Sequence, residues 1–303
     1  MLEMKPIEKR TVDTQYRRTL QEILERGERT TSQQEEDCYT LIAPSPMRFK
    51  LDNGFPLITE RNMAPKSVPI PQWQQAIGEI CAFVNGARTL AAMGEFGCTF
   101  WKLWATEEKC RKRGLPPGDL GPGSYGAAFH DFPMPSGNSF NQFADMVEEV
   151  KELPHLRTHF ITPWIPFYVP RRRGKQQKVV VAPCHGWVHI RIVNGKLTLH
   201  MFQRSADMVL GVPNNMTQYA ALTMMVAQVT GYSACEYVHS FSDAHIYMSH
   251  LTAVEKMLAR EEKTLPTVTV DGGVKDIFSF RREHFTLLDY YPHPGIKNLN
   301  AAI

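Results

Sequence analysis

The chain has 303 residues, of which 43% are hydrophobic and 21% charged, and its formal net charge is +3. These values are typical of a globular protein large enough to bury a sizeable core. So small a net charge does not indicate binding to nucleic acid, and the sequence has no apolar run long enough to span a membrane. The N-terminal segment is polar and has no apolar signal core, so we expect a cytoplasmic protein.

Helical spacing of apolar residues predicts helices over residues 12–28, 73–86 and 141–154. The third of these ends at a proline, which is a common stop signal. Between the first two, residues 47–57 alternate in polarity and then turn at Asn53–Gly54, which indicates a strand followed by a turn.

The second half of the chain is rich in predicted β-structure. Residues 178–205 read as strands, and Asn194–Gly195 is a strong signal for a two-residue hairpin turn. Residues 214–231 form a long apolar segment that predicts a buried helix, and residues 236–250 read as a strand followed by the start of a helix. Because we find no internal repeat and no long linker, we expect one α+β domain over residues 1–303.

Two basic clusters stand out, at residues 109–114 and 170–178. Both lie among glycine and proline residues, so solvated loops are the simpler interpretation. The alternative is a loop that binds phosphate or contacts another subunit.

The six cysteines are scattered and show no metal-binding spacing, so we expect reduced thiols and no metal site. Cys184 lies between a proline and a histidine in a predicted strand, where a buried core cysteine would be ordinary. A catalytic thiol needs cationic neighbours, because the thiolate is the reactive form. Arg204, Ser205, Asp207 and Asn215 supply a dense polar set after the hairpin, and an arginine beside a hydroxyl suits a phosphate group. The pattern alone leaves both interpretations of Cys184 open.

Several short sequence motifs decide between these two interpretations of Cys184. The chain resembles the thymidylate synthase family in "APCH" (182–185), "QRSADMVLGVPNN" (203–215), "SDAHIYMSH" (242–250), "YPHPGIK" (291–297), "NGFPLITE" (53–60), "FWKLWA" (100–105) and "GDLGPGSYG" (118–126). The resemblance implies a homodimeric α+β fold with a large twisted mixed β-sheet packed by helices, one sheet face of which forms the dimer interface. It also implies transfer of a one-carbon unit from 5,10-methylenetetrahydrofolate to C5 of a pyrimidine nucleoside 5′-monophosphate.

The resemblance also assigns roles to residues by their positions. Cys184 would be the nucleophile that adds to C6 of the pyrimidine, and Arg204 would bind the phosphate and lower the pKa of the thiol. The remaining catalytic residues would be Glu79, Tyr125 and Asp207, which move protons near the base and the folate. The residues that bind the nucleotide would be Arg29, Arg157, Arg204, Ser205, Asn215, His245, Tyr247 and His185, with Arg157 donated across the dimer interface. The folate would contact Trp101, Asp207, Glu79 and Asn214.

The sequence departs from the family pattern at positions that cluster around the base, the folate and the C-terminal tail. The changes are Thr158 for a second phosphate arginine, Asn214 for a phenylalanine, Lys102 for an aspartate, Glu60–Arg61 near a usual lysine, "MTQY" (216–219) for "IASY", and a tail that reads "NLNAAI" (298–303). This pattern favours a relative that keeps the thiol chemistry but lets water complete the reaction.

We therefore expect a pyrimidine nucleotide 5-hydroxymethylase, with a preference for cytidylate (CMP or dCMP). One alternative is a thymidylate synthase that converts dUMP to dTMP. Another, of a different class, is a non-catalytic relative that binds nucleotide or RNA. The expected partners are nucleotide, folate and a second copy of the chain, with neither membrane nor nucleic acid among them.

Overall fold

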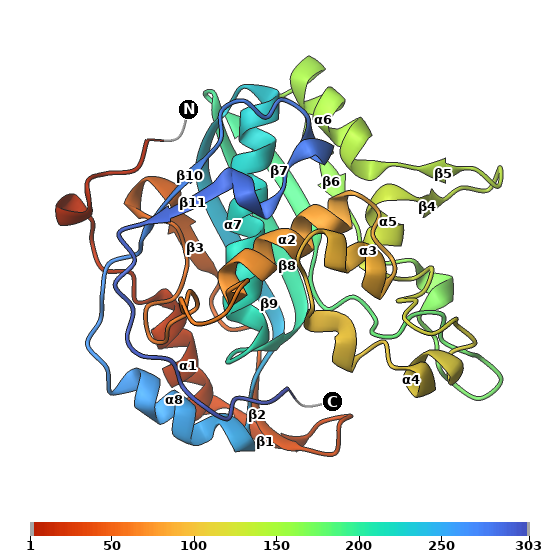
Figure 1. Cartoon of the computed structure of the whole chain (residues 1–303), viewed down its shortest axis with the longest axis horizontal. Helices are drawn as coiled ribbons and strands as arrows, with labels where there is room; N and C mark the ends of the chain where they lie inside the picture. Colours follow the sequence, from red (N-terminus) through yellow and green to blue (C-terminus); the bar gives the residue numbers. More distant parts are fainter. Residues whose placement is uncertain (1–2, 302–303) are drawn as a thin grey trace.

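The computed structural model describes residues 3–301, and its centre is a seven-stranded sheet (Figure 1). The strand order is β1–β2–β9–β8–β7–β6, and β3 also pairs with β9. The strands of this sheet are β1 (Glu28–Thr31), β2 (Asp37–Ile42), β3 (Met47–Lys50), β6 (Phe160–Ile161), β7 (Trp187–Val193), β8 (Lys196–Asp207) and β9 (Ser233–Tyr247). Two small hairpins, β4 (Phe132–Pro133) with β5 (Ser139–Phe140) and β10 (Thr267–Val270) with β11 (Phe285–Leu288), lie outside it.

The sheet is mixed, as the resemblance implies. Its two longest strands, β8 and β9, run parallel, whereas the other pairs are antiparallel. The β7–β8 hairpin turns at Asn194–Gly195, where both residues have positive φ, so this predicted turn is confirmed. Parallel strands need a crossover, and α7 supplies it between β8 and β9. This arrangement brings the carboxyl ends of the two strands to the same edge of the sheet.

Helix α7 packs against β8 and β9 of the sheet, and α2 packs on α7 near the middle of the molecule (Figure 1). The α-helices are α1 (Gln15–Arg26), α2 (Gln72–Val84), α3 (Leu90–Glu95), α4 (Glu107–Arg111), α5 (Tyr125–His130), α6 (Gln142–Glu152), α7 (Gly211–Thr230) and α8 (Leu251–Leu258). Short 3₁₀ helices are η1 (Ile7–Lys9), η2 (Leu51–Asn53), η3 (Phe100–Leu103), η4 (Pro166–Tyr168), η5 (Met248–His250), η6 (Ile277–Ser279) and η7 (Arg282–His284). The predicted helices 12–28, 73–86, 141–154 and 214–231 correspond to α1, α2, α6 and α7.

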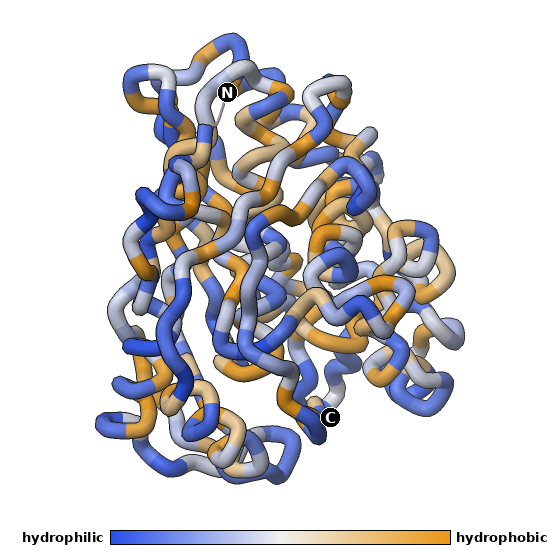
Figure 2. Tube along the Cα trace, turned by 60° about the vertical axis from the view of Figure 1, so that its left-hand side comes forward, coloured by the Kyte–Doolittle hydropathy of each residue, from blue (hydrophilic) through white to orange (hydrophobic). Residues whose placement is uncertain are grey.

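The hydrophobic core extends through most of the chain, from Tyr16 in α1 to Phe285 in β11. Most of α7 is buried, as its apolar sequence predicts. In Figure 2 the turns at the edge of the molecule are largely hydrophilic, whereas apolar segments gather nearer the interior. Within residues 3–301, no helix combines the length and the apolar character required to cross a bilayer.

The prediction that Cys184 lies in a strand is wrong. Residues 179–186 are irregular, and β7 begins only at Trp187. Gly186 has a φ of +100°, and a Cβ there would lie 2.9 Å from the hydroxyl of Tyr219. The backbone at Gly186 therefore bends where it approaches α7 closely. As a result Cys184 lies on a loop rather than in β7.

One face of the sheet carries large side chains that helices do not cover. Along β7 and β8 buried residues alternate with more exposed ones, and the exposed set includes Phe202 at 37%. Phe160 on β6 is 53% exposed, and with Phe202, Trp187 and two histidines it lines a hollow of about 210 Å³. An exposed aromatic patch of this kind is typical of an interaction surface.

Candidate active site

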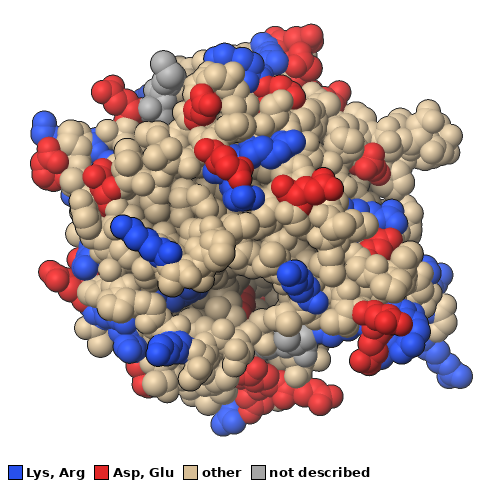
Figure 3. Space-filling view, viewed as in Figure 1, with Lys and Arg blue, Asp and Glu red and all other residues tan. Residues whose placement is uncertain are grey.

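A large cavity lies at the carboxyl ends of β8 and β9. Its volume is about 1180 Å³, and it is lined by the β1–β2 turn, α2, η3, the loop before β7, the start of α7 and the C-terminal tail. Figure 3 shows the surface hollowed near the centre of this face, with a basic side chain at the rim. Pockets for one small ligand have about 300–1,000 Å³, so this cavity is larger than a single small ligand usually occupies.

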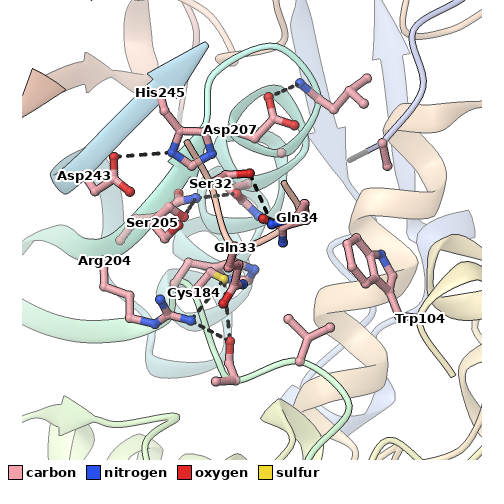
Figure 4. Close-up of a pocket in the computed structure, with 18 of the residues that line it drawn as sticks. Ser32, Gln33, Gln34, Trp104, Cys184, Arg204, Ser205, Asp207, Asp243 and His245 are labelled. Carbon is pink, nitrogen blue, oxygen red and sulfur yellow. Dashed lines mark hydrogen bonds and ion pairs between the residues drawn. The ribbon is translucent and has the colours of Figure 1, made fainter. Parts of the chain in front are cut away.

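The loop that carries Cys184 is held from both sides. The backbone N–H groups of Cys184 and His185 donate to the hydroxyl of Tyr125, at 2.6 and 3.3 Å. On the other side, Arg204 donates from Nε and Nη2 to the carbonyl oxygens of the two residues before Cys184, at 2.7 and 2.9 Å. The sulfur is thereby fixed in the cavity beside the Arg204 guanidinium (Figure 4).

The thiol of Cys184 is not ionised in advance. Nη2 of Arg204 lies 3.5 Å from Sγ and favours the thiolate, but burial raises the pKa of Cys184 above its ordinary value, and Asp243 adds to the increase. Arg204 therefore lowers the pKa of Cys184, as predicted, but burial raises it by more. At neutral pH the thiol keeps its proton, which must leave before the sulfur can attack.

His185 and Tyr125 order this loop while remaining uncharged. Burial lowers the pKa of His185 to about 3, and its Nδ1 lies 2.7 Å from the hydroxyl of Tyr219. Burial raises the pKa of Tyr125 well above its usual value, so its hydroxyl keeps a proton near neutral pH. Because this hydroxyl already accepts two N–H groups, its own proton is available to a ligand.

Glu79 lies on α2 and is 7% exposed. Its Oε1 accepts a hydrogen bond from the indole Nε1 of Trp101 at 2.5 Å, and its Oε2 accepts one from the Gln218 amide. Burial raises the pKa of Glu79 to about 7, and both hydrogen bonds oppose the increase. A carboxyl group that titrates near neutrality is suited to general acid–base catalysis. Glu79 also lines the cavity, so its carboxyl group lies beside the space that a ligand would occupy.

Asn215 and Asp207 are oriented by neighbouring polar groups. The Asn215 amide accepts from Gln203 Nε2 at 3.1 Å and donates to Gln218 Oε1 at 2.8 Å. Oδ1 of Asp207 accepts the backbone N–H groups of residues 209 and 210, at 2.9 and 3.1 Å. Both side chains line the cavity, as their predicted roles require.

The parallel pairing of β8 and β9 aligns Asp207 with three further polar side chains. Ser205 pairs with Asp243 and Asp207 with His245, so these residues lie together at the cavity, as Figure 4 shows. Nδ1 of His245 is 3.4 Å from Asp243, and the ring packs edge-on against Tyr247. Sequence reasoning missed Asp243, although it lies in the same string as His245.

Two of the predicted nucleotide-binding residues, Arg29 and Arg157, do not line the cavity. Arg29 is exposed on β1 and pairs with Asp37 at 2.6 Å, and Arg157 is exposed before β6. Their predicted roles in phosphate binding stay predictions. Lys102 is also exposed and does not line the cavity, unlike its neighbour Trp101, so its charge bears less on the site than the sequence suggested.

Other residues line the cavity without having been predicted. Trp164 lies 5.7 Å from the Arg204 guanidinium, and Arg171 donates to Gln33 in the β1–β2 turn. The basic clusters provided the signal for this region, since Lys109, Arg113 and Arg171 all line the cavity. For these three residues the alternative interpretation, a ligand-binding loop, agrees better with the structure than a purely solvated one. Leu299 and Ala301 of the tail also reach the cavity, whereas the last two residues of the tail lie outside the described part.

The model of the thymidylate synthase family matches residues 14–302. The chain belongs to the thymidylate synthase family. It is therefore a one-carbon transferase that acts on a pyrimidine nucleotide, with methylenetetrahydrofolate as co-substrate. A cavity larger than one small ligand usually occupies agrees with this pair of substrates. Across residues 3–301, no group of three or more His, Cys, Asp or Glu side chains is arranged to hold a metal ion.

The environment of Cys184 predicts that its alkylation requires a higher pH than that of an ordinary cysteine. The rate of Cys184 alkylation by iodoacetamide should rise with a midpoint above the roughly 8.5 of an ordinary cysteine, because burial disfavours the thiolate. Arg204→Gln should move the midpoint higher still, and Arg204→Lys, which keeps the charge, should move it less. Peptide mass mapping with Cys184→Ala as reference assigns the site, and Arg48→Gln on β3 is the control. A midpoint below 8, or one that Arg204→Gln leaves unchanged, would contradict this description.

Proposed function

We propose that the chain is a pyrimidine nucleotide 5-hydroxymethylase with a preference for cytidylate. In the proposed reaction the Cys184 thiolate adds to C6 of the base, which makes C5 nucleophilic toward the folate methylene group. A C5–carbon bond forms, C5 loses its proton, and the folate departs as tetrahydrofolate. Water then adds to the exocyclic carbon as the sulfur leaves C6, which gives a 5-hydroxymethyl product.

The observation that carries this proposal is the environment of Asn214. Its Nδ2 donates to the carbonyl of Leu210 at 2.9 Å, while its Oδ1 is buried and has no hydrogen-bond partner among the described residues. An unpaired buried acceptor is costly unless a water or ligand meets it. Asn214 lines the cavity, at the position where the family usually has a phenylalanine. We propose that a rotation of the Asn214 side chain turns this oxygen toward the cavity, where it would hold the water that adds to the exocyclic carbon.

The phosphate would lie at Arg204 and Ser205. Nε and Nη2 of Arg204 are engaged by the Cys184 loop, so a phosphate would meet Nη1 together with the Ser205 hydroxyl. Arg171 lines the same cavity and is fixed to Gln33 of the β1–β2 turn. We propose that it supplies from the same chain the charge that is missing at Thr158.

The assembly we propose is a homodimer that covers the open face of the sheet. The exposed aromatic residues on β6, β7 and β8 form a continuous patch, and a two-fold interface would bury the same patch on both copies. In such a dimer Arg157 would reach the cavity of the second copy, as the family pattern implies.

The product identifies the reaction. We would incubate the protein with methylenetetrahydrofolate and, separately, CMP, dCMP, UMP and dUMP, and record the nucleotide mass and the oxidation state of the folate. A gain of one CH₂O unit with tetrahydrofolate as co-product is expected, and Asn214→Phe should lower its yield about tenfold by removing the acceptor for water. Arg173→Gln, outside the cavity lining, serves as the control.

Other products would contradict the proposal. A gain of one CH₂ unit on dUMP with dihydrofolate as co-product would show a thymidylate synthase. A folded protein that binds nucleotide or RNA but yields no product with any of the four nucleotides would show a non-catalytic relative.

Arg171 gives a separate prediction. Arg171→Gln should raise the KM for nucleotide about tenfold with little change in kcat, because a charged contact to phosphate is lost in the ground state and transition state alike. Arg173→Gln removes a charge from the same loop but outside the cavity lining and should leave the KM unchanged. Equal effects of the two variants would mean that the loop acts only through its overall charge.

A further inference from the structure

A chain of buried polar side chains connects the amide of Asn215 with the carboxylate of Glu79. Asn215 Nδ2 donates to Gln218 Oε1 at 2.8 Å, and Gln218 Nε2 donates to Glu79 Oε2. Gln218 is fully buried on α7, while Asn215 and Glu79 are 6% and 7% exposed and line the cavity. One buried side chain therefore touches two groups that face the substrates.

The direction of these hydrogen bonds is fixed at both ends. At one end, Gln203 Nε2 donates to the carbonyl of Ser205 at 3.0 Å and to Asn215 Oδ1 at 3.1 Å. A carbonyl can only accept, so the Gln203 amide cannot be reversed without placing two oxygens together. At the other end the Trp101 indole can only donate, and it occupies Oε1 of Glu79. The Asn215 amide is thus held with its oxygen toward Gln203 and its nitrogen toward Gln218.

A fixed amide discriminates between the two pyrimidines. Uracil presents a donor at N3 and an acceptor at position 4, whereas cytosine presents an acceptor at N3 and donors at position 4. An amide held in one orientation complements one of these edges, and the other base would leave buried polar groups unpaired. If the amide could rotate freely, it could satisfy either base, and the discrimination would be lost.

We propose that Gln218 is the positioning residue that fixes the amide of Asn215 and thereby sets the choice between uracil and cytosine, while it holds the Glu79 carboxylate. This inference rests on the proposed function only in that a pyrimidine nucleotide binds in the cavity. Glutamine suits the role because it carries an acceptor and a donor on separate atoms. The family usually has a serine at this position, which is shorter and carries its donor and acceptor on one atom that can rotate.

Few other titratable groups lie close enough to Glu79 to interact with its carboxylate. The titratable side chains close enough for the Glu79 charge to raise their pKa are Cys98 and Tyr219. Burial raises the pKa of both well above neutrality, so they stay uncharged when Glu79 titrates. The hydrogen bonds from Trp101 and Gln218 are the contacts that stabilise the ionised carboxylate.

The test uses two variants that separate the two contacts. Gln218→Met keeps the approximate length of the side chain but removes both the acceptor and the donor. Gln218→Glu keeps an acceptor for Asn215 and replaces the amide donor with a second carboxyl group, which disfavours the ionised form of Glu79. For each, Kd values for UMP, CMP, dUMP and dCMP are measured by calorimetry without folate, and the Glu79 carboxyl is titrated by ¹³C NMR, assigned by its loss in Glu79→Gln.

We expect Gln218→Met to lower the ratio of Kd values between uracil and cytosine nucleotides about tenfold and to raise the pKa of Glu79. Gln218→Glu should keep the base ratio and still raise the pKa of Glu79. Thr223→Val, which removes a buried hydrogen bond from the same helix away from the cavity, should change neither quantity. A purely structural role would lower the unfolding temperature of the Gln218 variants without moving either readout.

The outcomes also separate this inference from the proposed function. Nucleotide binding with an unchanged base ratio in Gln218→Met would overturn the role of Gln218 alone. A missing hydroxymethyl product would contradict the proposed function and leave the binding ratios interpretable. If the wild-type protein bound no pyrimidine nucleotide, both proposals would be wrong.

Discussion

The site depends on how an irregular loop is fastened to the sheet and to α5. Residues 179–186 make no strand, yet the backbone around Cys184 is held by the Tyr125 hydroxyl on one side and by Arg204 on the other. Both contacts use side chains that also line the cavity. The groups that position the sulfur are therefore the groups that a nucleotide would touch, and binding and positioning of the nucleophile are coupled.

Around this loop, the sheet and helices bring together polar and titratable side chains from distant parts of the chain. The parallel register of β8 and β9 places Ser205 and Asp207 beside Asp243 and His245. Helices α2 and α7 add Glu79 and Asn215 from the core side, where burial brings the pKa of Glu79 to about 7. The result is a neutral thiol, a carboxyl that can gain or lose a proton near neutrality, and fixed amides. Such a site can transfer protons during the reaction although its thiol is uncharged before the substrates bind.

Local patterns predicted much of this. Periodicity located α1, α2, α6 and α7, and Asn194–Gly195 located the β7–β8 turn. Resemblance in short strings indicated the family, and most of the site residues that it assigned line the cavity. The strand predicted at Cys184 failed because Gly186 must bend the backbone against Tyr219, a contact between residues far apart in sequence. The basic cluster at 170–178 indicated the region of Arg171 but not which of its residues lines the cavity. The Gln218 bridge could not be inferred, since it depends on how α2 and α7 pack together.

The central claim is that Cys184 forms a covalent bond to C6 of a pyrimidine nucleotide while C5 attacks the folate. A 5-fluoropyrimidine nucleotide tests it directly, because fluorine at C5 cannot leave as a proton does and the adduct persists. The protein would be incubated with methylenetetrahydrofolate and the 5-fluoro derivatives of the cytidine and uridine monophosphates, in both ribose and deoxyribose forms, and then analysed by intact and peptide mass spectrometry. The account predicts that nucleotide and folate add together to the peptide that carries Cys184. A folded protein that forms no adduct, or one attached at another cysteine, would contradict it.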